Sequence, residues 1–240
     1  MRAHDLTPGR YLSPTPGGAY TAVQAPTDDP ARRTLLALMA GPSSPLLTPE
    51  SAVAWTGMPG PDDALEVVYR LQSLALVQAD EVARQAVPDA LERLLPGLLE
   101  RLSSTGRALL ADAQGFYIAS AGFPHETAER LSALSADLAS MHRRHASLLG
   151  ANLGLPGSNW ALVDAAGNSR IGAWTLHAGD ERFALVVAGV PRFNQPALVE
   201  LVWALVRRYA HAGRTPGSAA ATSSTTAPAT RSAPAAAQAR

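Results

Sequence analysis

Two histidines, His142 and His145, are the residues whose spacing comes nearest to a metal site. They stand three positions apart in the run Met141-His-Arg-Arg-His145, and residues three apart share one face of a helix. Zinc requires at least a third protein ligand, and Asp137 is the only acid nearby on the same helix. Two other interpretations stay open. The pair flanks a helix, or it lies in a dimer seam beside Met141, where protonation below about pH 6.5 would weaken association.

Catalytic motifs are absent from the rest of the sequence. There is no Cys, which excludes thiolate catalysis, disulfides and Cys-based zinc sites. No GxxxxGK[ST] phosphate loop and no GxSxG nucleophile turn occur, and sequence alone cannot bring scattered Ser, His and Asp together. We therefore expect a non-catalytic protein without a cofactor or a metal. An enzyme whose site is not visible in the sequence stays open as a third possibility.

Two arginines, Arg143 and Arg144, lie between the histidines. They can pair with acids on a partner protein, act like an arginine finger, or form a solvated helix face. The whole chain has 20 basic residues, all of them Arg, and 20 acidic residues. The basic residues do not cluster as they do in nucleic-acid-binding patches, so the charge pattern gives no sign of such a partner.

The strands and helices that would hold any site are found from two turns that share one sequence pattern. Asp112-Ala-Gln-Gly115 and Asp164-Ala-Ala-Gly167 each stand between two short apolar runs. Asp accepts hydrogen bonds from its own downstream backbone, and Gly adopts a positive φ without steric cost. The residues Asp112, Gly115, Asp164 and Gly167 therefore predict two hairpin turns.

Around these turns the hydrophobic periodicity predicts the order α-β-β-α-β-β-β-α over 88–213. The expected elements are a helix at 89–103 with a kink or break at Pro96, strands at 107–111 and 116–121, a long helix at 126–153, strands at 160–163, 170–176 and 182–188, and a helix at 196–211. The long helix is amphipathic, and at ~1.5 Å per residue it spans roughly 40 Å. This is longer than a five-stranded sheet needs for cover, which suggests a partner on part of its apolar stripe.

This order of elements resembles the Roadblock/dynein light chain family. The resemblance covers about half of the chain and is carried by 107–122, by the long helix and by 159–189. The family's pattern of strand, Asp-x-x-Gly, and a second strand with a small-residue exit is matched here by Asp112, Gly115, Ser120 and Gly122.

The resemblance implies an α+β sandwich, in which a five-stranded antiparallel sheet lies between two helices on one face and one on the other. Members usually dimerise by joining sheets edge to edge and packing their long helices together. They act as platforms for small Ras-like GTPases or as adaptor subunits, and in bacteria the family is associated with GTPases of polarity and motility. We therefore expect a homodimeric scaffold that binds or regulates a small GTPase or another regulatory protein. Its expected interface comprises Leu131, Leu134, Leu138, Met141, His142, His145, Trp160 and Leu162, with 160–163 as the open edge strand.

Residues 31–87 predict a small, mainly helical module that resembles a degenerate winged helix-turn-helix. Three short helices are followed by a strand at 74–77. The third helix, which would read DNA, carries Arg70 against the acids Asp62, Asp63 and Glu66. DNA contact is dominated by phosphate, so this charge opposes it. The alternative function is a transcriptional regulator, with 31–87 on DNA and the Roadblock-type domain as dimeriser.

The two ends of the sequence have the composition of mobile segments. Residues 1–30 are rich in Pro and poor in large apolar side chains, and 214–240 are Ala, Ser, Thr and Pro with three Arg and no acid. We expect a disordered arm and a disordered tail, the latter a solvated linker or a contact for an acidic partner. No signal-peptide core is visible, and the longest apolar run, 183–191, is far shorter than the ~20 residues of a membrane helix. We expect a cytoplasmic protein with no membrane contact.

Overall fold

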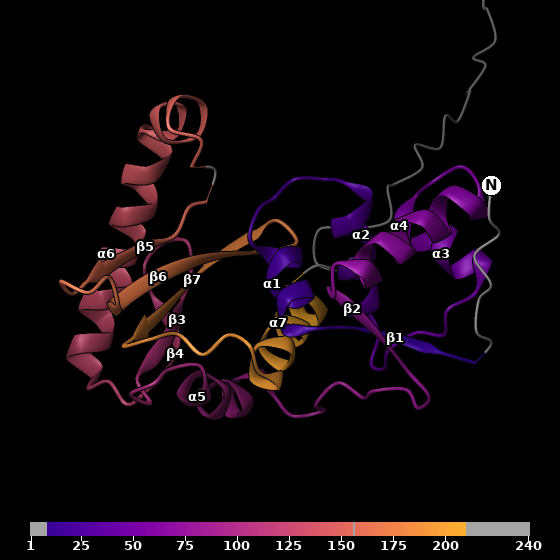
Figure 1. Ribbon diagram of the computed structural model, residues 1–240. Helices are drawn as coiled ribbons and strands as arrows, with labels where there is room; N and C mark the ends of the chain where they lie inside the picture. The colour runs from indigo at the N-terminus through magenta and orange to yellow at the C-terminus, as the bar shows by residue number, and fades with distance from the viewer. Residues whose placement is uncertain (1–8, 156, 210–240) are drawn as a thin grey trace, which may run out of the picture.

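The computed structural model describes residues 9–155 and 157–209, which form two parts that lie side by side (Figure 1). The N-terminal part, residues 9–87, contains β1 (Tyr11–Pro14), α1 (Pro16–Val23), α2 (Pro30–Leu38), α3 (Pro49–Thr56), α4 (Pro61–Ser73) and β2 (Val77–Asp80). The sheet part, residues 91–209, contains α5 (Leu91–Arg101), β3 (Ala108–Ala111), β4 (Tyr117–Ala121), α6 (His125–Arg144), the π-helical turn η1 (Ser147–Asn152), β5 (Trp160–Val163), β6 (Ser169–Ala178), β7 (Glu181–Ala188) and α7 (Pro196–Tyr209).

The sheet part is an α+β fold built on one antiparallel sheet of five strands, in the order β4-β3-β7-β6-β5. The element order predicted from the sequence is therefore confirmed for 91–209. The strand β7, which is apolar from Phe183 to Ala188, lies in the centre of the sheet, as its composition predicts. The strand β5 lies at one edge and β4 at the other.

Helices cover both faces of this sheet, because side chains along each central strand alternate between the faces. On one face, Leu110 of β3 and Leu185 of β7 belong to the large core shared with α5 and α7. On the other face, Leu109 of β3 and Val186 of β7 form a smaller core with Ala128 of α6. The expected arrangement, with two helices on one face and one on the other, is thus confirmed.

The helix α5 runs through Pro96 without interruption, so of the predicted kink or break, the break is wrong. Proline removes one intrahelical hydrogen bond, but the leucines of the same helix bury one continuous face. Leu95, Leu98 and Leu99 are all fully buried. Tertiary packing therefore holds the helix together across the proline.

The long helix is shorter than its periodicity predicts. α6 ends at Arg144, and His145 leaves the helical region with φ −108°. The chain continues in the wider turns of η1, which end at Asn152, and Gly154 follows with a φ of +66°. The prediction of one helix over 126–153 is therefore wrong for its last turns, where no side chain of η1 is buried to hold an α-helix.

The predicted disordered arm is also wrong for residues 11–23, which form β1 and α1. β1 pairs with β2 in an antiparallel two-stranded sheet. Leu12, Ala19, Ala22 and Val23 are fully buried. Order in this segment therefore comes from partners far away in the sequence, which composition alone does not reveal.

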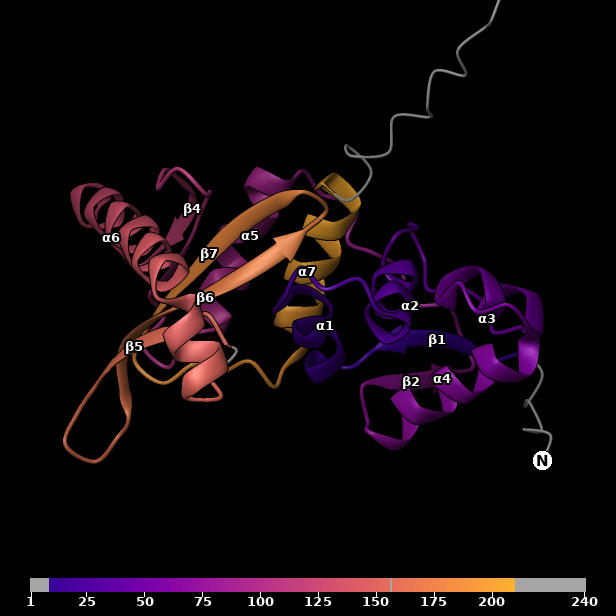
Figure 2. The same cartoon turned by 90° about the horizontal axis from the view of Figure 1, so that it is seen from above.

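The helix α1 lies between the two parts of the molecule (Figure 2). It packs on α7 and on β6 of the sheet part, and also on α2. The face of the sheet that carries α5 and α7 is thus covered by a third helix from the N-terminal part. Within the N-terminal part, α1 also lies close to the backbone of Leu76. This contact requires Gly18, because a Cβ there would overlap the carbonyl oxygen of Leu76.

In the N-terminal part, the three predicted short helices are present as α2, α3 and α4. Thr48 caps α3 by accepting from the Ser51 N–H, and the Ser51 hydroxyl accepts from the Thr48 N–H in return. The following strand is β2 at 77–80 rather than 74–77, because Ala75 takes a positive φ of 54° just before it. Its partner strand is β1, which precedes the helices.

The predicted tail at 214–240, residues 1–8 of the predicted arm and the end of the last predicted helix lie outside the described residues. Within the described ranges, no helix has both the length and the apolar composition needed to cross a bilayer.

Candidate functional site

The two predicted turns have the same geometry, and both are confirmed. The Asp112 carboxylate accepts from the N–H groups of Gln114 and Phe116 at 2.9 and 3.0 Å. The Asp164 carboxylate likewise accepts from Ala166 and Asn168, both at 3.0 Å. These backbone donors, Asn168 first, hold the pKa of Asp164 below its usual value.

Both turns end on a glycine in the left-handed region. φ is +92° at Gly115 and +83° at Gly167. A Cβ at Gly115 would also lie 3.1 Å from the Cβ of Ala136 on α6. The first turn therefore rests directly on α6, whereas the second projects from the β5–β6 end of the sheet and meets no neighbour at Gly167.

The face of α6 that packs on the sheet consists of small residues. Ala128, Ser132 and Ser135 are its buried side chains. The two serine hydroxyls donate to the carbonyls of Ala128 and Ser132, at 2.8 and 2.7 Å, so both can be buried without an unpaired donor. Leu131 of the predicted leucine stripe also packs against this smaller core, whereas Leu134 lies beside the sheet contact and is exposed.

An apolar groove of about 150 Å³ separates that leucine stripe from the sheet. It is lined by Leu131, Leu134, Ser135 and Leu138 of α6, and by Trp160, Ala161, Leu162, Ile171, Gly172, Ala173 and Val186 of the sheet. The structure thus brings together five of the eight predicted interface residues. Leu134 is 49% exposed and Leu162 is 68% exposed, although both are large and apolar.

The strand β5 forms the outer wall of this groove and the free edge of the sheet. It pairs with β6 on one side only. Val163 at its end is 55% exposed. Unpaired strand edges beside apolar side chains are surfaces that proteins either cover or pair.

Of the two predicted seam histidines, only His142 lies against the groove wall. Its ring stands edge-on to Trp160, with 6.2 Å between ring centroids. Both residues also border a second hollow near the end of α6, which includes Leu149 and Leu155. Met141 is half-buried, whereas His145 is exposed and its side chain reaches neither hollow.

The charges of α6 lie away from the groove. Arg143 and Arg144 are both exposed, and Arg143 donates to the Ser140 hydroxyl at 3.0 Å. At the start of the helix, Arg130 pairs with Glu126. Within the part of the chain that the structure describes, no three His, Asp or Glu side chains gather closely enough to hold a metal ion.

One polar cluster was missed by the sequence reasoning. The Tyr117 hydroxyl of β4 lies 2.6 Å from Nδ1 of His125, and Nε2 of that histidine lies 3.4 Å from Glu129. The i, i+4 spacing of His125 and Glu129 was a visible signal, but the tyrosine is brought to it by the hairpin. All these contacts are exposed to solvent, so we attribute no chemistry to them.

The helix that would read DNA presents acids to solvent. Asp62, Asp63 and Glu66 of α4 are exposed, together with Arg70. Three exposed acids against one arginine are unfavourable for contact with a phosphate backbone.

Comparisons with known proteins gave matches only among solved structures. No family model matches the chain, and no curated protein matches its sequence. A Roadblock/LC7 domain from Streptomyces avermitilis is similar to it, with 22% identity over 50% of this chain and 93% of that one, at a TM-score of 0.32. The gliding protein MglB from Thermus thermophilus has 21% identity over 50% of this chain and 87% of its own, at a TM-score of 0.31. MglB from Myxococcus xanthus has 19% identity over 49% of this chain and 88% of its own, at a TM-score of 0.29.

Proposed function

We propose that the protein is a non-catalytic, homodimeric scaffold that binds or regulates a small Ras-like GTPase. The observation that carries the dimer is the continuous apolar surface formed by α6, the groove and the edge strand β5. Leu134 and Leu162 stand on its two sides and are about half or more exposed in the single chain. Large exposed apolar residues that gather in one patch mark interaction surfaces.

A second copy of the chain fits this surface better than an unrelated partner. An edge strand can pair with its own copy across a two-fold axis, which satisfies the free backbone groups of both strands at once. The same axis would place the leucine stripes of the two α6 helices together over the joined edges. A symmetric dimer thus covers the edge strand and the groove in one step.

The GTPase as the partner of this dimer follows from the resemblance of 88–213 to the Roadblock family. The arginines Arg143 and Arg144 at the end of α6 are free to contact acids on such a partner, since both are exposed. The Roadblock-type domain would then serve as a platform, with the N-terminal part fixed beside it through α1. In a bacterium the scaffold would act in polarity, motility or signalling.

The dimer is tested by placing a charge on each side of the groove. Leu134→Arg and Leu162→Arg should each convert the dimer into a monomer, measured by light scattering, because a buried unpaired guanidinium is strongly unfavourable at an interface. Leu74→Arg is the matched control: Leu74 is 59% exposed but lies in the N-terminal part, away from the groove. A parent chain that is monomeric, or a Leu162→Arg variant that remains dimeric, would contradict the proposal.

The partner is tested by mass-spectrometric identification of proteins that copurify with the tagged chain. Recovery of a small GTPase that is lost with Leu162→Arg would support a platform made by the dimer. Salt-dependent retention on DNA would favour the transcriptional regulator instead, and no retention at low salt would end that alternative.

A further inference from the structure

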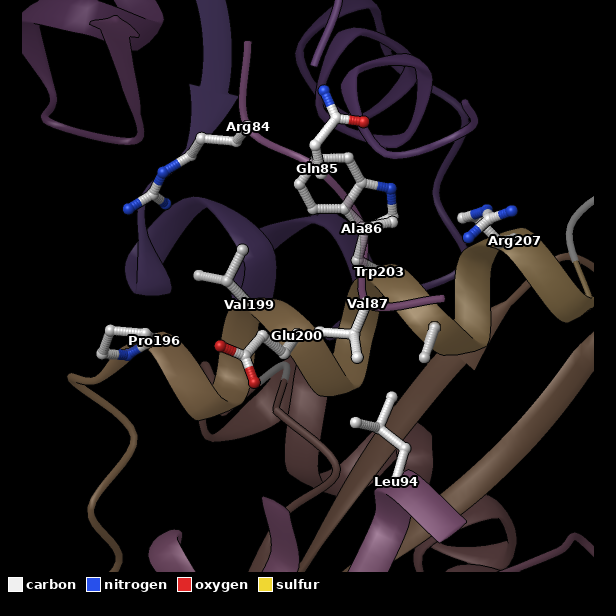
Figure 3. Close-up of a pocket in the computed structure, with 11 residues that line it drawn as sticks. Arg84, Gln85, Ala86, Val87, Leu94, Pro196, Val199, Glu200, Trp203 and Arg207 are labelled. Carbon is white, nitrogen blue, oxygen red and sulfur yellow. The ribbon is translucent and has the colours of Figure 1, made fainter. Parts of the chain in front are cut away.

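A separate hollow lies where the N-terminal part meets the sheet part (Figure 3). It has a volume of about 260 Å³ and is bordered by residues 84–87, by Leu94 of α5 and by one side of α7. Hydrogen bonds hold its walls in place. The Trp203 indole N–H of α7 donates to the Gly41 carbonyl at 2.9 Å, and the Ser44 N–H donates to the Arg84 carbonyl at 2.8 Å.

The floor of this cleft is apolar and its rim is cationic. Val87, Leu94 and Val199 supply aliphatic surface. Arg84 and Arg207 stand on opposite sides of the hollow (Figure 3). A site of this kind is suited to a small ligand that has an apolar body and a charged head group.

The two guanidinium groups differ in their ion pairs. Arg84 forms a long ion pair with Asp80 at 3.8 Å, and the same carboxylate accepts from the Ser13 hydroxyl at 2.7 Å. Among residues 9–155 and 157–209, no carboxylate forms an ion pair with Arg207. The one carboxylate that lines the cleft, Glu200, is held by Arg101 at 3.2 Å.

We propose that this cleft binds a small organic anion, with a carboxylate or phosphate head on a short apolar body. The head would accept charge-assisted hydrogen bonds from Arg207, which are among the stronger hydrogen bonds in proteins. The body would lie on the aliphatic floor. A volume of about 260 Å³ is just below the range of drug-sized pockets, ~300–1,000 Å³, so the ligand is small.

Occupancy of the cleft stabilises the junction between the two parts. The lining comes from both sides of that junction, so a ligand that binds only the assembled cleft favours the assembled state. The site is independent of the α6–β5 surface, and the test below applies equally to a monomer and a dimer.

The proposal is tested by isothermal titration calorimetry on the full chain. Hexanoate and phenyl phosphate are the probes. Hexanol is the control that lacks the charged head of hexanoate, and inorganic phosphate is the control that lacks the apolar body of phenyl phosphate. Hexanoate, phenyl phosphate or both should bind saturably, and the tighter one identifies the head. Arg207→Gln should weaken that binding about tenfold, the effect of losing one charge-assisted hydrogen bond. Arg208→Gln, on the adjacent residue that does not line the cleft, should leave it unchanged.

A second variant, Ala204→Leu, fills the hollow without removing a charge and should also weaken binding. Unfolding curves of each variant show that the fold is retained. Four results would overturn the proposal: no saturable binding of either probe, equal binding of hexanol, equal binding of inorganic phosphate, or equal losses for Arg207→Gln and Arg208→Gln.

Discussion

The hydroxyl of Tyr20 lies 2.7 Å from the side-chain nitrogen of Asn159, which donates to it. Tyr20 belongs to α1, and Asn159 directly precedes the edge strand β5. The Asn159 side-chain oxygen also accepts from the Thr175 N–H of β6 at 3.3 Å. The Tyr20 ring stacks on Phe193 at 6.1 Å between centroids, and burial raises the pKa of its hydroxyl. The N-terminal helix therefore helps to fix the point at which the edge strand begins.

Removing that hydroxyl should loosen the start of β5. Tyr20→Phe keeps the stacked ring and loses one hydrogen bond, which should cost about 0.5–1.5 kcal/mol of unfolding free energy. Hydrogen exchange of the β5 amides should become faster. Thr21→Val is the matched control, because the Thr21 hydroxyl donates only to Gly17 within α1. Equal exchange in β5 for parent and Tyr20→Phe would show that the contact does not position the strand.

Two adjacent glycines of α1 should respond in opposite ways to alanine. Gly18→Ala drives a Cβ into the Leu76 carbonyl oxygen and should lower the unfolding free energy by about 1–3 kcal/mol. Gly17→Ala meets nothing closer than 3.7 Å and should be neutral or stabilising by up to about 1 kcal/mol. Urea unfolding of both variants measures the difference. Similar effects of the two substitutions would mean that α1 does not approach Leu76 this closely.

The buried hydroxyl of Ser103 joins α5 to the sheet. It donates to the Ala188 carbonyl at 2.7 Å and accepts from the Thr105 and Arg107 N–H groups. Ser103→Ala removes the acceptor of the Thr105 and Arg107 N–H groups, while the Ala188 carbonyl keeps the Thr105 hydroxyl as a donor. The substitution should cost about 1–3 kcal/mol in thermal or urea unfolding. Ser73→Ala, which removes an exposed hydroxyl bonded only to Arg70, should have little effect. A neutral Ser103→Ala variant would contradict this role.

Acid should weaken the fold through His177. Burial lowers the pKa of this histidine, and the Arg32 guanidinium of α2 lowers it further. Because the folded-state pKa lies below the unfolded value of ~6.5, the unfolded chain takes up the proton first. The contribution of neutral His177 is therefore complete above about pH 6.5 and is lost as pH falls toward the folded-state pKa.

The measurement is the unfolding free energy in urea at about pH 7.5 and about pH 5.5, on either side of the unfolded pKa. His177→Asn should flatten part of the pH dependence, because it removes the group whose pKa is lowered on folding. Identical slopes for His177→Asn and the parent would contradict the assignment.

The parts of the fold that could be predicted are those whose cause is local. Asp112 and Gly115 lie within one four-residue turn and specify it by their own hydrogen bonds and φ. The apolar run of β7 indicates burial on both faces wherever its partners come from. The position of β5 at an edge was predicted through a resemblance rather than through its composition.

The parts that failed depend on distant partners. The composition around Pro14, Pro16 and Gly18 predicts a mobile arm. In the structure, Pro16 begins a helix and Gly18 permits contact with Leu76. The sheet-facing side of α6 was missed because serines that bond their own helix carry no hydropathic signal. The hollow at the junction has no sequence motif, since Arg84 and Arg207 come to line one cavity only when the two parts pack together.

The contact between α1 and α7 has a consequence for synthesis. These helices stand near opposite ends of the described chain, yet each covers apolar surface of the other. During synthesis on the ribosome, the apolar side of α1 stays uncovered until α7, the last element of the sheet part, has been made. Contacts of such long sequence separation slow folding and leave intermediates open to aggregation. A nascent or truncated chain that lacks α7 is therefore the species most in need of a chaperone.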